Sequence, residues 1–158
     1  MTRYLTLTIV CWLGAVAVGR AQPQAYTWQA ADSLAAVAPR PVVVFVHTNW
    51  CDYCLAMRQT TWRHPAAAAL LDTAFYFVPF DAESRAPVVF DGQTYRFAPS
   101  GVGTGVHAWA IHLGQIGETI AYPVVCILDR DRQIVFRHSG FIPARDMLRL
   151  LRAAAGGG

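Results

Sequence analysis

Residues 41–54 read Pro-Val-Val-Val-Phe-Val-His-Thr-Asn-Trp-Cys-Asp-Tyr-Cys, and this stretch decides the fold. Its first part, Pro41–Val46, is a short continuous apolar run rich in β-branched residues, which is typical of a buried central strand. The segment Cys51–Gln59 then continues without Gly or Pro, so a helix is expected there. A Cys-x-x-Cys motif therefore lies at the junction between a buried strand and a helix.

The spacing of Cys51 and Cys54 brings their sulfur atoms within reach of each other, because residues i and i+3 lie on the same side of a helical turn. Cys51 would occupy the helix amino terminus, where free backbone N–H groups and the helix dipole favour an anion. Since the thiolate is the attacking species in disulfide exchange, we expect Cys51 to be the nucleophile. Cys54, one turn inside the helix, is expected to be the more buried, resolving thiol.

Outward from this motif, helical and strand patterns alternate along the chain. The order predicts an α/β sandwich with a mixed central sheet flanked by helices. Helices are expected from Trp28 to Val37, at Cys51–Gln59, from Pro65 through Leu71, at Val106–Leu113 and at Pro143–Ala155. Strands are expected at Pro41–Val46, Phe75–Phe80, Val124–Leu128 and Gln133–Arg137, with a hairpin at Val88–Phe97 that turns at Asp91-Gly92 and a flexible loop at Pro99–Gly105.

The composition excludes several classes of protein. Charged residues make up only 15% of the 158-residue chain, but Leu5–Val18 is the one apolar run that stands out. This run is shorter than the roughly 20 residues that a spanning helix needs, so a polytopic membrane protein is excluded. The net charge is only +3 and the sequence contains no basic block. Nucleic-acid binding therefore has no electrostatic support.

The first 21 residues have the layout of a secretory signal peptide, in which Arg3 precedes an apolar core and small residues precede a cleavage point after Ala21. An uncleaved amino-terminal anchor is the alternative. We expect export to the periplasm and one mature domain, residues 22–158. Cys126 lies in an apolar run and is expected to be an inert buried thiol, and His107 and His112 are expected to be surface or half-buried polar residues.

On these residues the chain resembles the thioredoxin-like superfamily, and more narrowly the exported bacterial thioredoxin-related proteins. The resemblance spans most of the mature chain, from Trp28 to Leu151. Its matching pieces are Val42–Val46, Trp50–Cys54, Phe80-Asp81, Tyr122-Pro123 before Val124–Leu128, Gly140, the Asp91-Gly92 hairpin, Pro99-Ser100-Gly101 and Gly114-Gln115.

The resemblance implies a thioredoxin-like fold with a hairpin-containing insert, about residues 85–117, before the strand that follows the cis-proline. It implies that Pro123 has a cis peptide bond and faces the cysteine pair, and that Tyr122 flanks the substrate groove. Trp50, Asp52 and Tyr53, which surround the cysteines in sequence, are expected to contribute to substrate binding.

The chain also departs from thioredoxin proper. Phe45 stands where thioredoxin has a buried Asp six residues before the first Cys, and nearby His47 is a candidate to replace it in proton transfer. Asp52-Tyr53 replaces the Gly-Pro between the cysteines. A carboxylate beside Cys51 opposes thiolate formation, which favours a reductase or isomerase over a strong oxidase.

Two hypotheses for the function follow. The first is an exported thiol–disulfide oxidoreductase that acts on protein thiols or disulfides, exchanges electrons with a membrane-bound or soluble thiol donor, and needs no bound cofactor. The second is a non-catalytic binding module that holds a partner protein or a metal ion, with His47 or His64 completing a copper or zinc site. The departures at Phe45 and in the insert motivate the second hypothesis.

Overall fold

The structure, a computed structural model, describes residues 22–115 and 120–156, and strand β1 (Val42–His47) lies at the centre of its main sheet. The four strands of this sheet have the order β2-β1-β7-β8. Strand β2 (Tyr76–Asp81) pairs with β1 in parallel, whereas β7 (Val124–Leu128) pairs with β1 and β8 (Ile134–Ser139) pairs with β7 in antiparallel orientation. The predicted mixed sheet is therefore confirmed.

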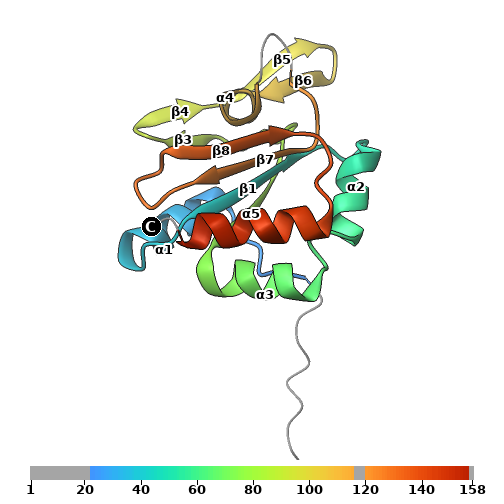
Figure 1. Ribbon diagram of the computed structural model, residues 1–158. Coiled ribbons are helices and arrows are strands. Elements are labelled where there is room, and N and C mark those ends of the chain that lie inside the picture. The colour runs from blue at the N-terminus through green and yellow to red at the C-terminus, as the bar shows by residue number, and fades with distance from the viewer. Residues whose placement is uncertain (1–21, 116–119, 157–158) are drawn as a thin grey trace, which may run out of the picture.

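Five helices of the described residues cover the two faces of this sheet (Figure 1). Helix α1 and helix α4 pack on one face together with the segment between β2 and α4. Helices α2, α3 and α5 pack on the other face, with α3 and α5 in contact beside each other. The helices are α1 (Trp28–Val37), α2 (Asp52–Gln59), α3 (Pro65–Ala74), α4 (Ala108–Gly114) and α5 (Ala144–Gly156).

Strand β1 is buried along its whole length because both faces of the sheet are covered. Its side chains alternate between the two cores: Val42, Val44 and Val46 pack against α1 and α4, whereas Val43 and Phe45 pack against α2, α3 and α5. This explains the continuous apolar run in the sequence, and it places the end of β1 directly before the cysteine motif.

Local sequence signals explain where several elements begin and which strand lies at an edge. The side chain of Thr27 caps α1 by accepting a hydrogen bond from the backbone N–H of Ala30. Pro65 occupies the first turn of α3, where no backbone N–H is needed. Pro79 lies in β2, which is an edge strand, as its missing N–H donor requires.

Two short hairpins connect β2 to α4. The first joins β3 (Val88–Phe90) to β4 (Gln93–Tyr95) through Asp91 and Gly92, which both have positive φ, so the predicted turn is confirmed. The second joins β5 (Phe97–Gly101) to β6 (Thr104–His107).

The second hairpin corrects the expectation of a flexible loop at Pro99–Gly105. The reason is that its glycines let the backbones of β5 and β6 approach each other closely, rather than making the segment a flexible loop. A Cβ atom on Gly105 would lie 2.4 Å from the carbonyl oxygen of Ala98, and Gly103 turns the chain with φ of +72°. Val106, which was expected to begin a helix, belongs to β6, and α4 begins at Ala108.

The predicted signal peptide, residues 1–21, lies outside the described residues, as do positions 116 and 117 at the end of the expected insert. Of the helices in the part of the chain that the structure describes, none is long and apolar enough to cross a membrane.

Candidate active site

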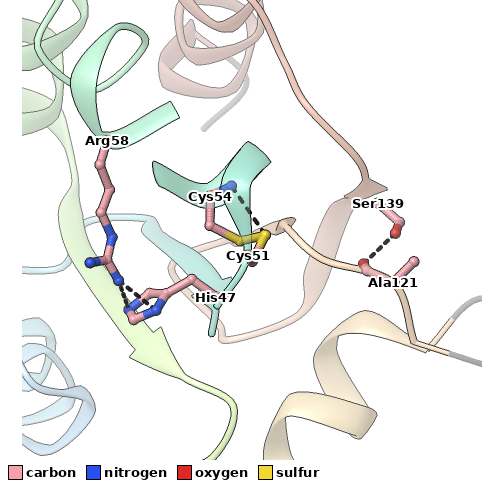
Figure 2. Close-up of a disulfide and its surroundings, with 6 residues drawn as sticks. All are labelled: His47, Cys51, Cys54, Arg58, Ala121 and Ser139. Carbon is pink, nitrogen blue, oxygen red and sulfur yellow. Dashed lines mark hydrogen bonds between the residues drawn. A yellow bond between two sulfur atoms is a disulfide. The ribbon is translucent and has the colours of Figure 1, made fainter. Parts of the chain in front are cut away.

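Cys51 and Cys54 form a disulfide at the amino terminus of α2 (Figure 2). Their Cα atoms are 5.2 Å apart, because Cys51 is the residue that caps the helix and Cys54 lies in its first turn. The side chains differ in access: Cys51 is 8% exposed and Cys54 is 1% exposed. An incoming group can therefore approach the sulfur of Cys51 more readily than that of Cys54.

The backbone around Cys51 favours negative charge on its sulfur. The N–H of Cys54 donates a hydrogen bond to Cys51 Sγ over 3.1 Å, in the place where a side-chain oxygen caps an ordinary helix. The amino-terminal N–H groups of α2 and the helix dipole both act in the same direction. The local fold thus provides an anion-stabilising position for one sulfur atom and not for the other.

The loop before β7 forms a second wall of the site. Its Tyr122–Pro123 peptide bond is cis, which is the isomer that the resemblance implied. Two hydrogen bonds tie this loop to the end of β8 and the residue after it: Ser139 Oγ donates to the Ala121 carbonyl over 2.6 Å, and Gly140 N–H donates to the Pro123 carbonyl over 2.7 Å. In Figure 2 the disulfide lies between this loop and the side chain of His47.

Trp50 presents an exposed aromatic surface next to Cys51. Its side chain is 67% exposed, and its ring packs edge-on against Tyr122 with centroids 6.0 Å apart. The indole N–H donates to Glu83 Oε1 over 3.0 Å. Tyr53, between the two cysteines, is also 67% exposed. Aromatic area therefore borders the disulfide on an accessible side.

Tyr122 is held as a neutral phenol. Burial raises its pKa to about 12, and the carboxylates of Glu83 and Asp81 add to this effect because negative charge opposes the phenolate. Within the described residues, its buried hydroxyl has no hydrogen-bond partner. The fold therefore leaves this hydroxyl neutral and without an acceptor inside the described chain.

The other expected binding residues are placed differently. Asp52 is exposed in the first turn of α2, where a carboxylate complements the helix dipole. Pro123, at the end of the loop before β7, is buried. The structure thus brings Trp50 and Tyr122 together beside the cysteines and leaves Asp52 facing solvent.

His47 and Arg58 form a contact that the sequence did not predict. Arg58 Nη2 lies 2.5 Å from Nδ1 and 2.8 Å from Nε2 of His47, on the side of α2 that also carries Cys54 (Figure 2). His47 is buried, and burial together with the positive charge of Arg58 lowers its pKa to about 4. The ring is therefore neutral at pH 7 and is a poor proton acceptor for a thiol, which counts against the suggested role of His47 in proton transfer.

Three contacts of this region depend on the fold: Trp50 with Glu83, Trp50 with Tyr122, and His47 with Arg58. Neither Glu83 nor Arg58 belongs to a sequence motif that would have identified it as a residue of this site. The register of β1 with β2 places His47 beside Asp81, at the end of the sheet where Glu83 follows.

Cys126 lies away from this site, in the core on the α1 and α4 side of the sheet. It is free and fully buried, and burial raises its pKa to about 12. The structure therefore agrees with a buried thiol of low reactivity. No group of three or more His, Cys, Asp or Glu side chains in residues 22–115 and 120–156 is arranged to hold a metal ion.

His107 corrects an expectation of the sequence. It was expected at the surface or half-buried, but it is fully buried, where its Nδ1 accepts from the N–H of Trp109 at the start of α4. Its Nε2 lies 3.1 Å from the Ala86 carbonyl. It joins α4 to the chain after β2 and is not part of the disulfide site.

Comparison with known proteins gives one family and a set of similar structures. The family model described as a Thioredoxin-like domain matches residues 28–155. A search of curated protein sequences found no match.

Among solved structures, a thioredoxin from Thermus thermophilus is 21% identical with a TM-score of 0.62, and the match covers 87% of this chain and 90% of that one. The DsbH oxidoreductase is 12% identical with a TM-score of 0.60, covering 100% and 96%. The oxidised DsbD C-terminal domain of Neisseria meningitidis is 20% identical with a TM-score of 0.54, covering 80% and 90%. At these identities the structures show a shared fold.

Proposed function

Because the chain belongs to the thioredoxin-like family, we propose that it is a thiol–disulfide oxidoreductase that exchanges disulfides with proteins through Cys51 and Cys54. One observation carries this proposal: the two sulfurs are bonded at the amino terminus of a helix, with one of them more accessible than the other. A disulfide between residues three apart closes a small ring and adds little to the cohesion of a fold of this size, so a chemical role explains it better than a structural one.

The geometry supports a two-step exchange. In the reducing direction, the Cys51 thiolate attacks one sulfur of a substrate disulfide, whose bond breaks, and the departing substrate thiolate takes up a proton. Cys54 then loses its proton and attacks Cys51 Sγ, which releases the second substrate sulfur as a thiolate that is protonated in turn. The substrate gains two electrons and two protons as two thiols, and the protein ends as the Cys51–Cys54 disulfide.

The surroundings of the disulfide suit a polypeptide substrate. Trp50 and Tyr53 offer exposed aromatic surface beside Cys51. The half-buried side chain of Tyr122 and the loop that ends in Pro123 form the opposite wall. These residues, with Asp52, are the substrate-binding surface that we propose.

Charge suggests the preferred direction. Asp52 follows Cys51 directly, and Asp81 and Glu83 lie close enough to Tyr122 to affect its titration. Negative charge near Cys51 opposes its thiolate and so disfavours a strongly oxidising protein, because strong oxidants stabilise the reduced thiolate form. We therefore propose a reductase or isomerase that is exported by its first 21 residues. A membrane-bound or soluble thiol donor reduces its disulfide again.

An insulin-reduction assay tests the proposal. Dithiothreitol regenerates the protein, and precipitation of insulin chains reports turnover. The full chain is expected to accelerate precipitation, and Cys51→Ser and Cys54→Ser are expected to abolish the acceleration. Cys126→Ser is the matched control, because it alters a thiol of the same chain that lies outside the site.

Equal rates for the unchanged chain, Cys51→Ser and Cys54→Ser would reject the exchange mechanism. That result would favour the binding-module hypothesis, in which the fold holds a partner without redox chemistry.

A further inference from the structure

A cavity of about 450 Å³ lies beside α2, against edge strand β2 and the chain that precedes α1. It is of the size that accepts a small organic molecule. Apolar groups make up most of its wall, and four polar side chains face the same space. The lining residues are Pro23, Ala25, Trp62, Phe77 and Pro79, with Gln22, His47, Arg58 and Asp81.

Arg58 brings a positive charge to this cavity that no carboxylate neutralises by direct contact. Its guanidinium contacts the ring nitrogens of His47, and no ion pair joins it to an acidic side chain of residues 22–115 or 120–156. A guanidinium has five N–H donors and no acceptor, so the contact with His47 leaves several donors unused. Since His47 is neutral at pH 7, the net charge of the pair is that of Arg58.

Trp62 provides a second, independent sign of a missing acceptor. Its side chain is only 3% exposed, and its indole Nε1 is buried without a hydrogen-bond partner in the described part of the chain. A buried polar group without a partner costs stability, and most such groups in folded proteins are paired. Arg58 and Trp62 therefore both have a donor without an acceptor, and the donor of Trp62 is buried within the cavity wall.

We propose that this cavity binds a small monocarboxylate with an apolar body. The carboxylate is held by Arg58, which can donate two parallel hydrogen bonds to it, beside the buried indole of Trp62. The apolar body packs against Phe77 and Pro79.

The charges of the wall select this class of ligand over more highly charged anions. Asp81 lines the same cavity as Arg58, so a dianion such as phosphate meets repulsion that a single carboxylate can avoid by facing Arg58. The mostly apolar wall excludes small hydrophilic acids, because they would lose hydration without burying apolar surface. Binding of a carboxylate in this cavity does not depend on disulfide exchange at Cys51 and Cys54.

Isothermal titration calorimetry on the oxidised full chain tests this proposal with 3-phenylpropionate and its uncharged amide, 3-phenylpropanamide. The acid is expected to bind about tenfold or more tightly than the amide, because a hydrogen bond to a charged group is worth more than one to a neutral group. In nuclear magnetic resonance spectra, the indole signal of Trp62 is expected to shift on binding of the acid.

Variants assign the preference to Arg58. Arg58→Gln is expected to remove the preference for the acid, and Arg58→Lys is expected to keep part of it because the charge remains. Arg149→Gln, which changes an exposed arginine of α5, is the matched control and is expected to bind like the unchanged chain. Equal affinity for acid and amide, an unchanged preference in Arg58→Gln, or absence of binding by the folded chain would overturn the proposal.

A third ligand distinguishes two possible sources of the bound carboxylate. N-acetyl-phenylalanine represents a peptide carboxyl terminus, and 3-phenylpropionate represents a free apolar acid. Tighter binding of the first would assign the site to peptide ends, and tighter binding of the second to free acids; both results support a carboxylate site at Arg58.

Discussion

Lowering the pH from 7 to 4 is expected to destabilise the fold through His47. In the folded chain the pKa of this histidine is lowered from 6.5 to about 4, because burial and the Arg58 charge both oppose protonation. The unfolded chain therefore binds a proton at a higher pH than the folded chain does. The contribution to stability is complete above pH 6.5 and is lost as the pH falls towards 4.

The size of this effect follows from the two pKa values. A shift of one unit corresponds to about 1.4 kcal/mol, so the free energy of unfolding falls by about 2 kcal/mol between pH 7 and pH 5 and by about 3 kcal/mol at pH 4 from His47 alone. Other groups also titrate in this range, among them His107 and His112, whose pKa values are lowered by burial. Their contributions are shared by the variants compared below and cancel in the difference.

Urea unfolding followed by tryptophan fluorescence at several pH values between 7 and 4 measures the effect. The unchanged chain is compared with His47→Gln, which keeps an acceptor for Arg58 but cannot be protonated. The control is His138→Gln, which replaces an exposed histidine. His47→Gln is expected to lose about 2 kcal/mol less stability than the unchanged chain on going to pH 5, while the control follows the unchanged chain. Parallel curves for His47→Gln and the unchanged chain would refute the reasoning.

Three further predictions concern the cores and the hairpins. Leu151→Ala removes a fully buried side chain and is expected to cost about 2–5 kcal/mol of unfolding free energy in urea, whereas Leu55→Ala, at a position that is 52% exposed, is expected to cost much less. Gly105→Ala is expected to lower the melting temperature, because its new Cβ would collide with the Ala98 carbonyl oxygen; an unchanged melting temperature would contradict the close approach. Cys126 is expected to resist iodoacetamide in the folded chain at pH 8 and to react in urea, because it is buried and burial raises its pKa to about 12. Alkylation is measured by mass spectrometry, and alkylation of Cys126 in the folded chain would contradict this prediction.

The elements that the sequence predicted well are those with local signals. The β-branched run before Trp50 is buried on both faces, and the segment after Cys51 lacks helix breakers, so strand and helix both appeared where expected. The turn at Asp91-Gly92 has a backbone conformation that these residue types adopt readily.

The β5–β6 hairpin was missed because glycine has two opposite uses. A run containing Pro99 and three glycines is typical of a loop, yet at Gly105 the absence of a Cβ lets two backbones approach. Sequence alone does not show which use applies, since the answer depends on where Ala98 lies in space.

The cysteine pair of the candidate site was predictable, whereas its surroundings were not. Cys51 and Cys54 are three residues apart, so helical geometry alone brings them together. Arg58 and Glu83 act through partners that the sheet brings near, and a long polar side chain in isolation gives no sign of its partner.

Equilibration of the full chain across a series of reduced and oxidised glutathione ratios, read by alkylation and intact mass, tests the proposed exchange most directly. We expect Cys51 and Cys54 to become alkylated together as one two-electron couple, while Cys126 in the folded chain stays unmodified throughout. A Cys51–Cys54 pair that never opens across the series, or that opens without ever closing again, would contradict disulfide exchange as the function of this site.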